Sequence, residues 1–222
     1  MKSEIRYRPS FASIFLELEG QDHVIAEADA MASMSSNITL EPRPAGGFLN
    51  GLLRWFGGRE SFFVNDFSVS DGTSGELVLT QNTPGDIACL DLEDGKEMYF
   101  QPGAFIACTP EIKLGTGFAG FKSFFAREGL FRLHASGHGK IWFGAFGGLI
   151  EKEIRGEYIV DTAHLVAYEP QISLHIQTAS SGLFSSFFSG EGFVTRLQGE
   201  GKIYLQSRSL NGLTSWINPK LM

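Results

Sequence analysis

A threefold internal repeat constrains the fold of this chain more than any other feature of its sequence. Three short segments alternate polar and apolar residues in the same way: Glu76–Leu79, Lys140–Phe143 and Lys202–Leu205. Ile141 follows Leu77 by 64 residues, and Ile203 follows Ile141 by 62 residues. Because side chains two residues apart in a strand lie on one face, the segments predict three equivalent strands, each with one apolar face.

Two further segments recur in the same order before these strands. The first combines charged residues with a turn, and it occurs at Leu16–Ala26, Leu90–Phe100 and Glu153–Val160. The second is apolar at both ends, and it aligns Ala32–Leu40 with Ala107–Leu114 and Ala167–Leu174 when one gap is placed in each of the last two copies. By ordinary strand and turn lengths, a repeat of this size holds about five or six strands.

The pattern predicts an all-β fold in a single domain, residues 1–222. The apolar runs are short, helical periodicity is weak, and the 27 glycines indicate many tight turns. We place three tandem repeats at residues 12–80, 86–143 and 150–206, followed by a tail at 207–222. Three copies can close in a pseudo-threefold arrangement that leaves no copy with an unmatched side. We expect the tail to pack back on the repeats or to mediate assembly.

Each repeat also contains a loop that is bracketed by glycines and rich in aromatic residues. The bulky apolar residues of these loops are Phe48, Leu52, Trp55, Phe56, Phe118, Phe121, Phe124, Phe125, Leu183, Phe184, Phe187 and Phe188. Two interpretations are open. These side chains either plug one end of the core, or form an exposed apolar patch that contacts a membrane or a partner protein.

Charge and cysteine content narrow the classes of function. The net charge of −7 disfavours nucleic acid as the main partner, because that affinity comes mostly from Lys and Arg. Cys89 and Cys108 are the only cysteines, and we expect two buried free thiols. The N-terminus lacks the apolar core of a secretory signal, and no apolar run is long enough to span a bilayer. A cytoplasmic protein is expected, with the loops as its contact to a membrane surface.

Motifs that carry chemistry elsewhere favour structural roles here. The glycines of Gly115–Gly120 match a dinucleotide fingerprint, but they open a repeat loop instead of the N-terminus of a helix. His134 and His138 could begin a metal site together with His164 or His175, but the pair alone falls short of the three or four ligands that a zinc site uses, and Gly137 and Gly139 indicate a turn there. We therefore predict no catalytic residue, no cofactor and no metal site.

Several spaced motifs resemble the altered-inheritance-of-mitochondria family and its bacterial relatives. They are Gly57–Asn65, Gly75–Leu77 with Pro84–Ile87, Gln101–Ala107 and Gly199–Arg208. The resemblance implies a β-rich fold similar to that of the tryptophan RNA-binding attenuator protein, with three such units per chain. It implies a mitochondrial role only for eukaryotic members, and it carries over no catalytic residue. Glu4, Glu17 and Glu19 are unlike a mitochondrial presequence, so we expect a bacterial origin.

The sequence leads to two hypotheses of function from different classes. In the first, the protein is a non-enzymatic scaffold whose clustered aromatic loops contact a membrane or a partner protein, and it forms a homo-oligomer. In the second, it is a small-ligand-binding module with a pocket between repeats. RNA binding is the least favoured of the binding functions, because the chain is acidic.

Overall fold

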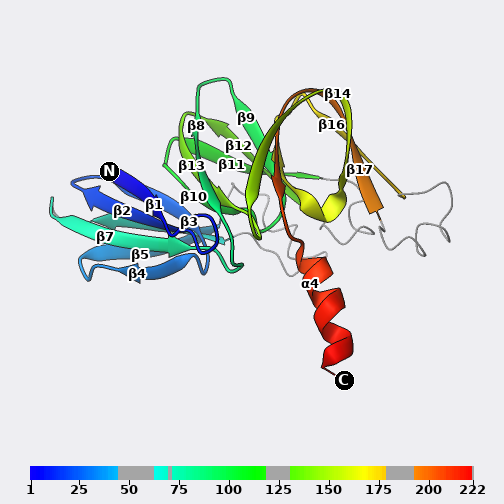
Figure 1. Ribbon diagram of the computed structural model, residues 1–222. Coiled ribbons are helices and arrows are strands. Elements are labelled where there is room, and N and C mark those ends of the chain that lie inside the picture. The colour runs from blue at the N-terminus through cyan, green and yellow to red at the C-terminus, as the bar shows by residue number, and fades with distance from the viewer. Residues whose placement is uncertain (45–62, 70–71, 119–130, 179–192, 222) are drawn as a thin grey trace.

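The computed structural model describes residues 1–44, 63–69, 72–118, 131–178 and 193–221. It confirms the predicted all-β class, since the named strands form three antiparallel sheets. Three sets of strands lie side by side in a row (Figure 1), coloured blue to cyan, green, and yellow to orange in chain order. We call these sets the first, second and third units.

The strands recur in the same order in each unit. The N-terminal strand β1 spans Lys2–Arg6, and the first unit holds β2 Ser13–Glu19, β3 His23–Glu27, β4 Met31–Met34, β5 Ile38–Pro44, β6 Phe63–Val69 and β7 Ser74–Thr80. The second unit holds β8 Ile87–Leu92, β9 Glu97–Phe100, β10 Phe105–Cys108, β11 Ile112–Phe118, β12 Phe131–Gly137 and β13 Gly139–Gly144. In the third unit, two long strands each replace two shorter ones: β14 Leu149–Asp161, β15 Leu165–Tyr168, β16 Ser173–Thr178 and β17 Phe193–Gln206.

The units also share their hydrogen bonding. A side-chain oxygen of Ser35, Thr109 or Glu169 accepts a hydrogen bond from the backbone N–H of the unit's last strand, at 2.9, 3.1 and 2.8 Å respectively. The same three residues accept a backbone hydrogen bond from the isoleucine that begins or precedes the next strand. Three different residue types therefore accept the same backbone hydrogen bond, and this equivalence is not visible when the residue identities are compared.

The predicted alignment of the second repeated segment was wrong by one residue. Ser33 pairs with β7 at the position where Ala107 pairs with β13 and Ala167 with β17. In each unit a bulge comes just before this position, and in the first unit the bulged residue is Ala32. Because all three units have this bulge, Ser33, Ala107 and Ala167 are the equivalent residues, and the alignment needs no gap.

The core lies on both sides of β13. The predicted apolar face is buried, since Ile141 and Phe143 are inaccessible and pack in one cluster. Trp142 is equally buried but belongs to a second cluster with residues of the first unit. Because β13 is covered on both faces, it does not alternate between buried and exposed side chains.

Strand pairing continues from one unit to the next. β3 of the first unit pairs with β10 of the second, and β9 of the second pairs with β15 of the third. Among the described strands, none of the third unit pairs with one of the first. The sheets therefore join the units in a row.

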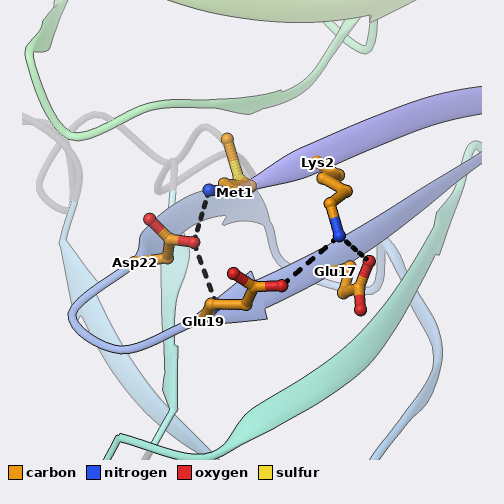
Figure 2. A network of polar contacts seen from close by, with 5 residues as sticks. All are labelled: Met1, Lys2, Glu17, Glu19 and Asp22. Atoms are coloured by element: carbon orange, nitrogen blue, oxygen red, sulfur yellow. Dashed lines mark hydrogen bonds and ion pairs between the residues drawn. The ribbon is translucent and has the colours of Figure 1, made fainter.

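Polar contacts hold β1 against β2 and the turn that follows it (Figure 2). Lys2 Nζ lies 3.0 Å from a carboxylate oxygen of Glu17 and 3.4 Å from one of Glu19. The Met1 ammonium lies 2.5 Å from the Asp22 carboxylate, which also accepts the Glu19 backbone N–H at 2.9 Å. Burial acts to raise the pKa of Asp22, but these two hydrogen bonds outweigh it and hold the pKa below its usual value. β1 thereby covers the outer edge of β2.

The C-terminal tail is helical, which the sequence did not predict. The short helix η1 spans Thr162–His164, and the tail forms α4 Leu210–Ile217 and η2 Asn218–Lys220. Ser209 caps α4, because its hydroxyl accepts the Gly212 backbone N–H at 3.1 Å. In Figure 1, α4 points away from the sheets instead of packing back on them. Within the described ranges, no helix is both long and apolar enough to cross a membrane.

Candidate functional site

A cleft of about 350 Å³ lies where the three units come together. The first unit lines it with Gln81 and Thr83, which follow β7. The second contributes the turn before β10 and the end of β13, and the third contributes η1, β15 and the end of β17. Leu210 and Asn211 at the start of α4 complete the lining. A cavity of this volume is at the small end of the range for ligand sites.

Two glutamines fix the walls of the cleft. The Gln206 side chain accepts the Phe146 backbone N–H at 2.9 Å and donates to the Ala163 carbonyl at 2.8 Å. Gln81 donates to the Ala145 carbonyl at 3.0 Å. Each amide links the last strand of one unit to backbone of another segment, so the cleft is held by bonds between distant parts of the chain. These glutamines therefore shape the site and are not free to follow a ligand.

The lining is polar but uncharged. Its described side chains are amides, hydroxyls and apolar groups, with no Asp, Glu, Lys or Arg among them. Next to the cleft, His164 Nδ1 lies 2.7 Å from the Gln206 carbonyl oxygen, so its ring is held by the backbone. Such a surface offers neutral hydrogen-bonding groups to a ligand and no fixed charge to attract an ion.

An ion pair between a buried carboxylate and a half-exposed guanidinium supports the cleft from outside. Asp86 is 5% exposed, and its carboxylate receives two hydrogen bonds from the Arg8 guanidinium, at 2.7 and 2.9 Å. The hydrogen bonds to Asp86 raise the pKa of Arg8 despite the opposing effect of burial. The Asp86 carbonyl in turn accepts the Ala145 backbone N–H at 2.9 Å, and Ala145 lines the cleft. The pair thus ties the segment before β2 to the junction of the first and second units.

Most of the predicted contact residues lie outside the described residues. Only Phe118 is placed, at the end of β11 and opposite Phe131 of β12. The other residues are Phe48, Leu52, Trp55, Phe56, Phe121, Phe124, Phe125, Leu183, Phe184, Phe187 and Phe188. The strands that flank the loops form three equivalent hairpins, which pair Pro44 with Phe63, Phe118 with Phe131, and Thr178 with Phe193.

The weaker motifs fall in strands. Gly115 and Gly117 are inside β11, opposite His134 and Arg132, so the glycine motif does not join a strand to a helix. His134 in β12 and His138 just after it have different partners. His134 lies 3.1 Å from Glu97, and His138 lies 3.4 Å from Asp94. No group of three or more metal-ligating side chains occurs in the part of the chain that the structure describes.

The prediction of two buried thiols was right for one cysteine. Cys108 is inaccessible, and burial raises its pKa to about 12. Cys89 lies on β8, the edge strand of its sheet, and its side chain is exposed. The period of two within a strand does not tell which face a neighbouring sheet will cover.

The cleft itself was not predicted residue by residue. Gln81 directly follows β7 and Gln206 is the last residue of β17, so both lie at the end of the last strand of a unit, and this was a usable signal. The contribution of α4 had no such signal, because the tail has no counterpart in the other repeats.

Comparisons with known proteins agree with the repeat and the fold. A protein of Streptococcus pyogenes that is described as uncharacterized is 30% identical over 219 residues, which cover 95% of this chain and 87% of that protein. A crystal structure of a protein from the same bacterium superposes with a TM-score of 0.80 at 26% identity and covers 99% of both chains. These relatives agree with the predicted bacterial origin. The model of the family described as Mitochondrial biogenesis AIM24 matches residues 3–208, so this chain belongs to that family, as the resemblance of its motifs indicated.

Proposed function

We propose that this protein is a non-enzymatic binding protein whose cleft between the three units takes a small, uncharged polar molecule. The observation that carries the proposal is the convergence of all three units and α4 on one cavity. A ligand there would contact segments from distant parts of the chain at once. Its binding would therefore couple the units to one another.

The chemistry of the lining sets the class of ligand. Amide and hydroxyl groups such as those of Thr83, Gln101 and Asn211 can donate and accept hydrogen bonds. Phe146 and Leu165 add apolar surface. A ring with hydroxyl or amide groups, such as a nucleoside or a monosaccharide, matches this mixture. A phosphate would have to leave water without a cation to pair with, which costs free energy.

Thermal unfolding with a panel of nucleosides and monosaccharides tests the proposal. A ligand at 100 times its dissociation constant adds about 2.7 kcal/mol of stability, which is a rise of roughly 5–10 °C in Tm for a chain of this length. Phosphorylated forms of the same compounds are the charged comparison, and we expect them to give smaller shifts.

A matched pair of variants tests whether the rise in Tm comes from binding in the cleft. Thr83→Trp places an indole in the cleft, whereas Asn82→Trp puts the same group on the exposed neighbour that does not line it. The shift should vanish in Thr83→Trp and persist in Asn82→Trp. If no compound in the panel changes Tm, or if both variants respond like the wild type, the cleft is not the binding site.

A second function rests on the hairpins and on α4. The three aromatic loops join equivalent hairpins, and α4 exposes Leu210, Leu213 and Trp216 at 56%, 38% and 62%. Aromatic and leucine side chains on a short amphipathic helix favour the interface of a membrane. Co-sedimentation with liposomes compares the wild type with Phe121/Phe125/Phe184/Phe188→Ser and, separately, with Trp216→Ser. Equal binding by all three, or no binding by the wild type, rules out a membrane contact by these groups and leaves a partner protein as the alternative.

A further inference from the structure

Among the described strands, two lack a partner that their counterparts in the other units have. β10 pairs with β13 on one edge and β3 on the other, and β15 pairs in the same way with β17 and β9. Their counterpart β4 pairs with β7 and with no other described strand. The second half of β14, Gly156–Asp161, corresponds to β3 and β9, but among the described strands it pairs with β17 alone. Each end of the row thus carries one half of an interface that the chain already uses twice.

Burial follows the same pattern. All residues of β10 and β15 are buried, whereas all of β4 is exposed, including Met31 and Met34 at 37% and 38%. Ile159 of β14 is 52% exposed, while its counterpart Ile25 in β3 is 4% exposed. Both unpaired edges therefore present apolar side chains that pairing covers in the other units.

The two existing interfaces fix the register that a third one would have. Both pair consecutive residues in the same register: Ala107 with Ala26, Cys108 with Ile25, Ala167 with Phe100, and Tyr168 with Tyr99. The equivalent positions in the unpaired edges are Ser33 opposite Val160, and Met34 opposite Ile159. The second pair in each interface is largely apolar, and Tyr99 and Tyr168 stack with ring centroids 5.4 Å apart. Met34 and Ile159 fit this position as a third apolar pair.

The edge of β4 is unprotected. Exposed edge strands usually carry charges or proline, which block pairing with another chain. The sequence of β4 is Met-Ala-Ser-Met, with neither. Within one molecule, β4 and β14 lie at opposite ends of the row (Figure 1), so they do not satisfy one another.

We propose that copies of this chain associate head to tail, with β4 of one copy pairing antiparallel with Gly156–Asp161 of the next. The interface is heterologous, because the two surfaces differ, and it builds a closed ring or an open filament according to the angle between successive copies. It repeats between chains the contact that joins the units within a chain. This inference is independent of the ligand proposed for the cleft.

Disulfide cross-linking tests the register. Residues directly opposite in an antiparallel pair have Cα atoms about 4.5–5.5 Å apart, within the range that a disulfide bridges. Met34→Cys and Ile159→Cys are made as separate proteins, both with Cys89→Ser to remove the exposed native thiol. Mixed and oxidised, they should give a disulfide-linked heterodimer that neither protein forms alone. Ile150→Cys, on the same strand and 49% exposed, is the control and should link to Met34→Cys much less.

Measurement of mass by light scattering tests the association itself. The mass of the wild type should rise with concentration across the micromolar range. Ile159→Lys places a charge in the interface and should weaken association roughly tenfold or more, whereas Ile150→Lys should leave it unchanged. Three outcomes would overturn the proposal: a wild type that stays monomeric, an Ile159→Lys variant that associates like the wild type, or a heterodimer yield no higher than the control. A disulfide within a single Met34→Cys/Ile159→Cys chain would also overturn it, because the edges would then meet inside one molecule.

Discussion

Gly85 lies where the connections between the units cross, and we expect Gly85→Ala to destabilise the fold severely. It is buried and bridges to Gly147 in the connection that leads to the third unit. A Cβ at Gly85 would lie 1.9 Å from the Ala145 carbonyl oxygen, 2.7 Å from the Gly147 nitrogen and 2.8 Å from the Gly147 oxygen. All three atoms are backbone, so no side chain can rotate away to make room.

The cost follows from the hydrogen bonds that must give way. Ordinary contact begins at 3.4 Å, so the Ala145 carbonyl would have to retreat by about 1.5 Å. The same crossing holds three backbone hydrogen bonds of 2.8–2.9 Å, from Gly147 to Pro84, from Asp86 to Gly147 and from Ala145 to Asp86. At about 1 kcal/mol each, and more where a buried group is left without a partner, their loss costs about 3–5 kcal/mol.

Urea unfolding measures this cost, with Gly115→Ala as the control. A Cβ at Gly115 meets its nearest neighbours only at 3.8–4.0 Å, so that variant should unfold within about 0.5 kcal/mol of the wild type. Gly85→Ala should lower the midpoint without changing the slope. A loss below about 1 kcal/mol would refute the reasoning, because it would mean that the connections can separate without breaking their hydrogen bonds.

Three further predictions concern single side chains. Arg8→Ala should cost about 1–3 kcal/mol in urea unfolding, because it leaves the 5% exposed Asp86 carboxylate without its cation; unchanged unfolding would contradict this. Cys108 should resist iodoacetamide at pH 8 until the protein unfolds, which mass spectrometry of labelled peptides can measure. Because burial raises the pKa of Cys108 to about 12 in the folded protein, its contribution to the free energy of unfolding should be present below pH 9 and decline as the pH rises from there. Cys108→Ala should make that decline smaller. Arg132→Met removes a guanidinium that lies 4.5 Å from the centroid of the Tyr99 ring and that donates a hydrogen bond to the Tyr168 hydroxyl. The substitution should lower the free energy of unfolding in urea by about 1–2 kcal/mol. An unchanged free energy of unfolding would show that these contacts contribute nothing.

Repeated pattern made the fold predictable from sequence. The spacing of Leu77, Ile141 and Ile203 placed three equivalent strands, and the structure buries all three side chains completely. Local rules suffice here, because the period of two in a strand depends only on the backbone. The same rules failed for Trp142 and Cys89. Whether the second face of a strand is covered depends on which sheet lies beyond it, and that is decided by segments far away in the chain.

The residues of the candidate site could be identified only from the tertiary structure. Gln81, Gln101 and Gln206 are ordinary in sequence, and only the meeting of three units brings them to one cleft. The helix of the tail could not be predicted from the sequence either. α4 is a single short helix that occurs in no other repeat, and it buries no residue that would require an apolar face at helical spacing.

The sequence by itself determined that this protein is all-β and built from three similar units, because alternation and spacing are properties of the chain. Only the tertiary structure decided which edges those units share. Ile25 and Ile159 occupy equivalent positions, yet one is buried beside Cys108 and the other is 52% exposed. The physical reason is that a strand edge is satisfied by its neighbour in space, and the first and last units of a row have one neighbour fewer than the middle one.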